Sequence, residues 1–351
     1  MNRSTVFCEL SAIFEPANLF NLTCMAYLAS KRMSYWGQLG ILAAFTGAGL
    51  LIGGIVSLIP LFGKLDLKNF HGLSSKEVMD SLFVPENANV LRWVQFLTTL
   101  FLFFLPPVFY AWLCHKKAFT HLGFRNKVSV PQFFISVVIM IAALPLVGAL
   151  AELTKMLPFS KISFDKFQAA EEAYNKQVSI IGRMNNSTDY ILSLLMLAIL
   201  PAMFEETIFR GGLQNLLSRW WKMPIFSIVV TAVIFSIVHG SYFGFLSRAV
   251  LGFLLGWMYY RTGNIWLNII AHAANNAFAV TAIYLMRLKD PKMDIAKADV
   301  NLSMWWGLIS LVVIFVLFIL FEKFSQYQIN KPGEEVIIRD QDLNKPSWVT
   351  D

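Results

Sequence analysis

Charged residues are scarce in this sequence, and their scarcity excludes an ordinary soluble protein. Only 15% of the 351 residues are Asp, Glu, Lys or Arg, whereas soluble domains usually carry about 25%. Hydrophobic residues make up 56% of the chain, and the mean hydropathy is +0.57. Cysteine is also rare, and the irregular spacing of Cys8, Cys24 and Cys114 excludes a disulfide framework and a CxxC metal site. The composition therefore predicts an integral membrane protein.

Several hydrolase and transporter signatures are missing as well. The sequence contains no H-E-x-x-H, which excludes a soluble zincin, and no G-x-S-x-G, which excludes a rhomboid-like serine site. Paired intramembrane aspartates, which aspartyl intramembrane proteases need, are also absent. No internal repeat is visible, and this argues against a transporter built from inverted repeats.

Apolar runs predict an all-α fold, a polytopic transmembrane helical bundle with about eight spanning helices. A hydrocarbon core requires about 20 consecutive apolar residues per helix. The expected spans are 36–62, 91–114, 131–152, 188–210, 224–243, 246–261, 264–286 and 303–323. The predicted division of the chain is an N-terminal extension (1–35), N-terminal helices and loops (36–187), a core with intramembrane polar residues (188–286), a loop and last span (287–323) and a flexible cytoplasmic tail (324–351).

The N-terminal extension does not resemble a signal peptide. Glu9 and Glu15 interrupt its apolar stretch, and basic residues follow that stretch rather than precede it. Because Met33 stands directly before a long apolar run, we hypothesise that translation starts at Met33 rather than Met1.

Basic residues gather in alternate connections, although the net charge is only +7. This distribution favours membrane topology over a nucleic-acid surface. The basic positions are Lys31, Arg32, Lys116, Lys117, Arg125, Lys127, Arg210, Arg219 and Lys222. By the positive-inside rule, these connections and both termini are expected in the cytoplasm. We expect a multi-pass protein of a bacterial cytoplasmic membrane, with membrane lipid as a partner.

Two adjacent carboxylates, Glu205 and Glu206, end the fourth predicted span. Ionisable groups inside a membrane are expensive and usually functional. Glu206 and Arg210 are four residues apart and share a helix face, so the spacing predicts an ion pair. Glu205 is then free to act as a general base. Pro201, one turn earlier, is expected to kink the fourth span and free backbone groups near the site.

His239 and His272 lie in two further apolar runs. Glu205 lies 17 residues before Lys222 and His239 lies 17 after it, so a hairpin turning there brings the two side chains together. His272 lies roughly 12 Å into its span at 1.5 Å per residue, which places the site in the cytoplasmic half. Matching that depth requires the hairpin to project beyond the inner surface, and the polar and aromatic residues around its turn suit such a projection. These are Gln214, Asn215, Arg219, Trp220 and Lys222. Asn276, one turn after His272, is a candidate to orient water or stabilise an oxyanion.

Two imidazoles and a carboxylate can activate water in two ways. Glu205, His239 and His272 are candidate ligands of a divalent, zinc-like metal ion. Alternatively, Glu205 and a histidine act as general bases without metal. The residues leave both routes open.

Three motifs in order resemble the CPBP intramembrane metalloprotease family, which includes type II CAAX prenyl endopeptidases and bacteriocin-processing, Abi-like proteins. They are E-E-x-x-x-R at 205–210, F-x-x-x-H from Phe235 to His239, and H-x-x-x-N from His272 to Asn276. The resemblance covers about 190–285. It implies an intramembrane endopeptidase in which Glu205 activates water, His239 and His272 position it or a metal, and Arg210 and Asn276 support the site, with Glu206 and Phe235 as further supporting residues.

The expected substrate is a peptide or membrane protein, with no nucleic acid. The alternatives are a non-proteolytic immunity or scaffold protein that uses the same pocket for binding, and, less favoured, a transporter.

Overall fold

The computed structural model describes residues 31, 33–62, 81–126, 128–184, 186–290 and 304–329. These residues form helices and contain no β-strand. Most of the predicted extension 1–35, which carries the question of the start residue, and most of the tail 324–351 lie outside the described residues. The helices are α2 (Tyr35–Val56), η1 (Ile59–Leu61), η2 (Pro85–Asn87), α4 (Ala88–Thr99), η3 (Leu100–Phe104), α5 (Leu105–Cys114), α6 (Ala118–His121), α7 (Val130–Ala142), α8 (Leu144–Lys155), α9 (Lys161–Ile181), α10 (Ser187–Ser193), η4 (Leu194–Ile199), α11 (Leu200–Glu206), η5 (Thr207–Gln214), α12 (Asn215–Trp221), α13 (Pro224–Val238), α14 (Phe245–Thr262), α15 (Ile265–Lys289) and α16 (Met304–Ile329).

Six helices among the described residues, rather than the eight predicted, are long and apolar enough to cross a membrane. They are Tyr35–Leu61, Pro85–Cys114, Val130–Lys155, Ser187–Trp221, Ile265–Lys289 and Met304–Ser325. The predicted spans 224–243 and 246–261 correspond to α13 and α14, which are not among the six. α13 has only 15 residues, because the chain turns after Val238 and Gly240 adopts a φ of 65°, a left-handed conformation that favours glycine. The predicted fold class, a helical membrane bundle, is confirmed.

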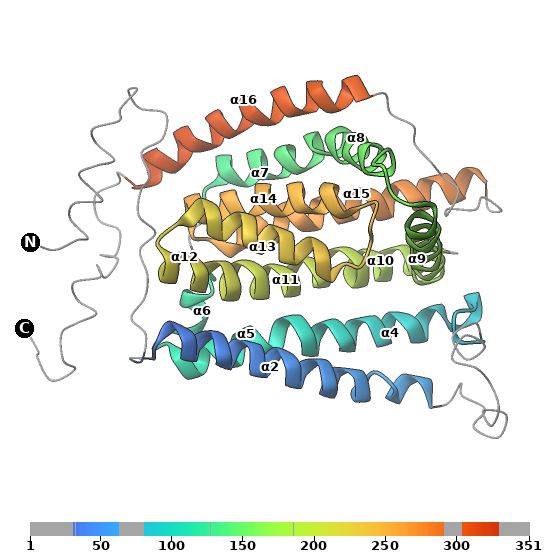
Figure 1. The fold of residues 1–351 in the computed structure, drawn as a ribbon, viewed down its shortest axis with the longest axis horizontal. Coiled ribbons are helices and arrows are strands. Elements are labelled where there is room, and N and C mark those ends of the chain that lie inside the picture. The colour runs from blue at the N-terminus through green and yellow to red at the C-terminus, as the bar shows by residue number, and fades with distance from the viewer. Residues whose placement is uncertain are drawn as a thin grey trace, which may run out of the picture.

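The spans run roughly side by side, with the polar core helices in the middle (Figure 1). α2 packs against α5 and η3 on one side, while α16 packs against α7 and α8 on the other. α11, α13, α14 and α15 lie between these outer layers (Figure 1). α13 and α14 form a tight antiparallel pair, because Gly252 brings the backbone of α14 against Ala232.

The predicted basic connections share one end of the bundle. The start of α2, α6 and the end of α12 all lie at the left of Figure 1. Two of the predicted loop residues lie elsewhere than expected, since Arg210 and Arg219 are buried within the long helix that ends at Trp221. Which side of the membrane this end faces stays a prediction.

α9 lies across the opposite end of the bundle. It is seen almost end-on in Figure 1, where the spans lie in the plane of the view. Its aromatic face packs on the connection between α13 and α14: Phe164 contacts Phe243, with ring centroids 5.5 Å apart, and Phe167 stacks on Tyr242 at 4.1 Å. α9 therefore covers the loop that follows His239.

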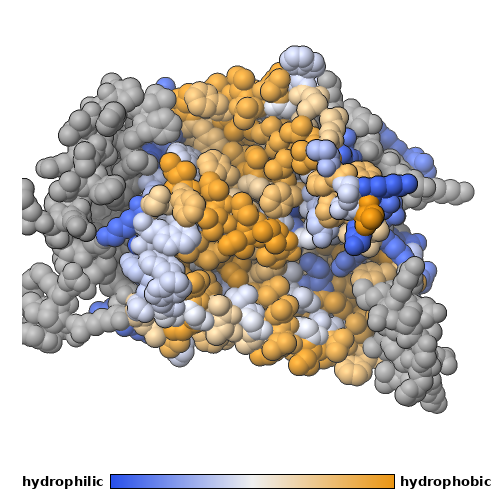
Figure 2. All heavy atoms as spheres, viewed as in Figure 1, coloured by the Kyte–Doolittle hydropathy of each residue, from blue (hydrophilic) through white to orange (hydrophobic). Residues whose placement is uncertain are grey.

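The surface between the two ends is apolar. In Figure 2, hydrophobic residues form a broad band across the middle, and hydrophilic residues gather toward the ends of the bundle. Large apolar side chains on the outer helices are widely exposed, among them Leu51 at 70% and Val312 at 64%. Such exposure is unfavourable in water and is expected for side chains that face lipid.

Candidate active site

The two glutamates lie within one long helix whose regular pattern is interrupted on both sides. Pro201, which lacks a backbone N–H, lies in the first turn of α11. The π-helical segment η4 directly precedes α11. A second π-helical segment, η5, follows Glu206 directly. The helix type therefore changes directly before and after α11, while the predicted kink at Pro201 stays a prediction. Such π segments are frequent at functional sites, and here they flank the two carboxylates.

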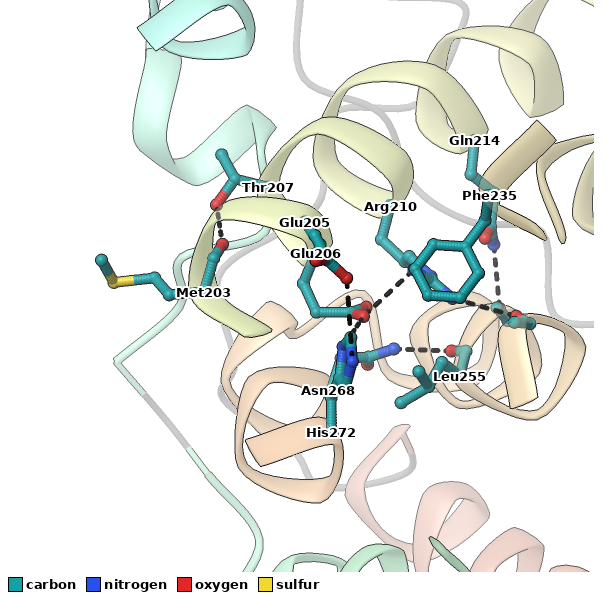
Figure 3. Close-up of polar contacts among 12 residues, drawn as sticks. Met203, Glu205, Glu206, Thr207, Arg210, Gln214, Phe235, Leu255, Asn268 and His272 are labelled. Atoms are coloured by element: carbon teal, nitrogen blue, oxygen red, sulfur yellow. Dashed lines mark hydrogen bonds and ion pairs between the residues drawn. The ribbon is translucent and has the colours of Figure 1, made fainter. Parts of the chain in front are cut away.

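Glu206 and Arg210 form the predicted ion pair. Arg210 Nη1 lies 3.0 Å from Glu206 Oε1, and both side chains are fully buried. Arg210 also donates from Nη2 to the carbonyl of Gly252 at 3.1 Å, and its guanidinium lies over the Phe235 ring at 4.9 Å (Figure 3). Arg210 therefore joins the long helix to α13 and α14 and holds Glu206 in place.

Glu206 has a second role that the sequence did not predict. Its Oε1 lies 2.8 Å from Nδ1 of His272 (Figure 3). The same Oε1 accepts from Arg210 Nη1, so it is an acceptor and Nδ1 of His272 donates its proton to it. This bond fixes the tautomer of His272 and leaves the lone pair of Nε2 available.

His239 is oriented in the same manner by backbone. It caps the end of α13, and its Nδ1 lies 2.7 Å from the carbonyl oxygen of Phe235. A carbonyl only accepts, so Nδ1 carries the proton and Nε2 presents its lone pair. The predicted hairpin is confirmed: the chain turns at Lys222, with a φ of 53°, and brings His239 to Glu205.

Both histidines direct Nε2 toward Glu205. The distance from Glu205 Oε2 is 3.7 Å to His239 Nε2 and 3.8 Å to His272 Nε2. Oε2 is buried and has no hydrogen-bond partner among the described residues. The separations exceed a direct hydrogen bond, but a water molecule can bridge groups at such distances. The arrangement therefore has three acceptors converging on one small region.

A carboxylate oxygen and two imidazole nitrogens are atoms that bind metal ions well, but they stand farther apart here than in an assembled metal site. Tetrahedral zinc ligands, each about 2.1 Å from the ion, stand about 3.4 Å apart, and Nδ1 bonds of the kind seen here usually support metal-bound histidines. However, no group of three or more His, Cys, Asp or Glu side chains in the described part of the chain is arranged to hold a metal ion. The predicted ligand set of Glu205, His239 and His272 is thus close together but not assembled, and the metal stays a prediction.

Asn276 and Phe235 complete the predicted set. Phe235 packs beside both imidazoles, with centroid distances of 4.5 Å to His239 and 6.0 Å to His272. Asn276 lies one turn beyond His272 on α15, half-buried, and its Oδ1 accepts a hydrogen bond from Asn275 at 3.4 Å. No direct bond joins Asn276 to Glu205 or the histidines among the described residues, so its predicted role depends on substrate.

Sequence reasoning missed the polar contacts that fix α14. Gln214 donates to the carbonyl of Gly256 at 2.8 Å, and Asn268 donates to that of Leu255 at 2.6 Å. The available signal was the small-residue spacing of Gly252 and Gly256, four residues apart, which permits close helix approach in membranes. Gln214, like Asn215 and Arg219, is buried rather than projecting beyond the bundle.

The segment 187–278 matches the model of the family described as type II CAAX prenyl endopeptidase Rce1-like. The resemblance predicted from the motifs is thereby confirmed, and the matched segment contains every candidate site residue. No solved structure gives a significant match to the chain.

Curated relatives come from Bacillus subtilis (strain 168). The chain is 32% identical over 108 residues to the protein named "Putative membrane peptidase YdiL", which covers 28% of this chain and 44% of that protein. It is 31% identical over 98 residues to "Uncharacterized protein YyaK" (25% and 32% covered) and 29% identical over 100 residues to "Uncharacterized protein YpbD" (27% and 46%). The chain thus spans less than half the length of these relatives.

Proposed function

We propose that this chain is a membrane-embedded endopeptidase that hydrolyses a peptide bond with water activated by Glu205. The family match and the name of one relative support a membrane peptidase. The observation that carries the mechanism is the convergence of the Nε2 atoms of His239 and His272 on the unpaired Oε2 of Glu205.

In the proposed first step, Glu205 accepts one proton from water as the water oxygen attacks the scissile carbonyl carbon. Nε2 of His239 or His272 accepts a hydrogen bond from the second water hydrogen and so orients the nucleophile. The carbonyl π electrons move to oxygen and form an oxyanion. The carbon–nitrogen bond then breaks as the proton passes from Glu205 to the leaving amine.

Asn276 is proposed to stabilise the oxyanion. Its amide Nδ2 is a donor one turn from His272 on the same face of α15, and no described residue accepts from it. Removing one such donor from a comparable site costs about 10²- to 10³-fold in rate. Glu206 and Arg210 do not touch substrate in this scheme; they position His272.

The substrate is proposed to be a membrane-associated peptide or protein. Glu205 and both histidines lie within a bundle whose flanks are apolar, so the scissile bond is expected to enter from lipid or from the membrane surface. The prenyl substrates in the family's description belong to that family, and no prenyl specificity is proposed for this chain.

A quenched fluorescent peptide library tests this function with purified protein in liposomes. Wild-type protein should cleave some members, and Glu205→Gln should lower the rate by about 10² to 10⁴, the range for loss of a general base. Glu172→Gln, at an exposed glutamate on α9, is the matched control and should leave cleavage unchanged. Cleavage that survives in Glu205→Gln would contradict the proposal, whereas peptide binding without cleavage in wild type would favour a non-proteolytic scaffold.

A further inference from the structure

Arg248 is a cation near the candidate active site, and the proposed hydrolysis does not use it. It lies in the first turn of α14, half-buried, one turn before Gly252. One turn places the two on the same face of α14, about 6 Å apart along its axis. Since the carbonyl of Gly252 binds Arg210, Arg248 lies beside the polar centre on the side of α9.

The Arg248 guanidinium packs into the loop that follows His239 and connects α13 to α14. A Cβ built on Gly244 would lie 2.1 Å from Arg248 Nη1, so the guanidinium occupies the space that a side chain would fill. It also lies over the ring of Tyr174 of α9, 5.4 Å from the centroid. That loop begins directly after His239, which caps the end of α13.

This cation has no anionic partner among the described residues. Its Nη1 is buried and makes no hydrogen bond. The carboxylate of Glu171 on α9 is bound instead by the hydroxyl of Ser241, which donates at 2.8 Å. Arg210 and Arg261 differ from Arg248 in this respect, since Arg210 pairs with Glu206 and Arg261 pairs with Glu322.

Three physical costs accompany this arrangement. A cation inside a membrane bundle is expensive and normally paired. A cation in the first turn of a helix is unfavourable beside the positive end of the helix dipole. A buried guanidinium N–H without an acceptor loses its hydration. The contact with Tyr174 offsets only part of these costs, and an anion brought by a ligand would offset all three.

We propose that Arg248 is a specificity residue that binds a carboxylate of the substrate close to the scissile bond. This inference rests on the proposed function and adds a substrate class, namely peptides with either a free C-terminal carboxylate or an acidic side chain at that position. Arginine suits this task because its planar fork binds both carboxylate oxygens. Neutral peptides would then be poorer substrates.

Matched peptides test the proposal. A peptide cleaved by wild-type protein is prepared as the free acid, as the C-terminal amide, and with each acidic side chain replaced by its amide. One of these neutralisations should lower kcat/KM by roughly ten- to hundredfold, chiefly by raising KM. A loss of this size is expected when one charge-assisted hydrogen bond is removed. The peptide that loses activity shows whether the bound carboxylate belongs to the C-terminus or to an acidic side chain.

Variants of Arg248 distinguish a role in carboxylate recognition from a purely structural role. Arg248→Gln should remove the preference by slowing the acidic peptide alone, Arg248→Lys should retain part of it, and Arg248→Glu should favour a peptide with lysine at that position. Lys166→Gln, at an exposed cation of α9, should change nothing. Equal loss for acidic and neutral peptides in Arg248→Gln, or no preference in wild type, overturns the proposal.

A binding measurement keeps this proposal distinct from the proteolytic function. Fluorescent free-acid, amide and side-chain-neutralised peptides are titrated against Glu205→Gln protein, with and without Arg248→Gln. Tighter binding of the carboxylate peptide that disappears with Arg248→Gln supports carboxylate recognition even if no peptide is cleaved. Equal affinity for all peptides refutes it even if Glu205-dependent cleavage is established.

Discussion

Removing Arg210 should destabilise the protein more than removing Arg210 and the charge of Glu206 together. In Arg210→Met, the carboxylate of Glu206 keeps the bond from His272 but loses its counter-charge in a fully buried position. Breaking a buried pair by deleting one partner costs about 3 to 5 kcal/mol. We therefore expect a loss of that size in the free energy of unfolding.

The double variant Glu206→Gln/Arg210→Met leaves no buried charge at this position. The glutamine carbonyl can still accept from His272, so the remaining losses are the hydrogen bond to Gly252, about 1 kcal/mol, and the cation–π contact with Phe235, about 1 to 2 kcal/mol. The double variant should thus lose about 2 to 3 kcal/mol. The difference, about 1 to 2 kcal/mol, measures the cost of leaving the buried carboxylate unpaired.

Unfolding in mixed micelles, followed by loss of tertiary fluorescence as denaturing detergent is added, gives these free energies. Lys155→Met, which breaks a partly exposed pair with Glu152, is the control and should change stability by under about 1 kcal/mol. If Arg210→Met costs no more than Lys155→Met, or if the double variant is less stable than Arg210→Met, the reasoning about the buried pair is refuted.

Three further predictions follow from the structure. Gly211→Ala should lower stability because a Cβ there would lie 2.7 Å from the backbone oxygen of Leu122, whereas Gly212→Ala, with its nearest atom at 3.4 Å, should be tolerated; equal melting temperatures for the two variants would contradict this. Burial lowers the pKa of His115 to about 3, so this histidine stays neutral in the folded protein, while the unfolded chain binds a proton below about pH 6.5. Stability should therefore fall as the pH drops from about 6.5 toward 3. The part of this fall that lies between pH 7.5 and 5.5 should shrink by about 1.4 kcal/mol in His115→Gln. A pH profile identical to that of wild type would refute that assignment. If the site needs a metal, chelator treatment should abolish cleavage and added zinc should restore it; full activity of a sample shown to be metal-free by elemental analysis would support the metal-independent route.

Local spacing was sufficient to predict two contacts of the site. The i,i+4 relation of Glu206 and Arg210 holds because both lie on one continuous helix. The pairing of Glu205 with His239 follows from a hairpin turn at Lys222, which fixes the register of two antiparallel helices connected in sequence. In both cases, the chain itself determines the geometry.

Contacts between helices far apart in sequence could not be predicted in this way. The bond from His272 to Glu206 depends on the rotation and depth of α15 against α11, which no residue count determines. The burial of Gln214 and Asn215 was misjudged because polar residues near a helix end are normally solvated, whereas these bind a backbone carbonyl of α14 and the carbonyl of His121. The early end of α13 was missed because apolar character continues past Val238 while the backbone turns.

The contacts on α14 have a consequence for the order of assembly in the membrane. α13 and α14 are not among the six helices able to cross a bilayer by length and composition, so their insertion is expected to occur as a hairpin rather than as two independent spans. The long helix precedes this hairpin in the chain, so Arg210 and Gln214 are already present when the α14 carbonyls that they bind are inserted. His239 can therefore reach Glu205 as soon as this hairpin packs against the long helix, and a chain arrested before α15 would carry the general base with His239 but without His272.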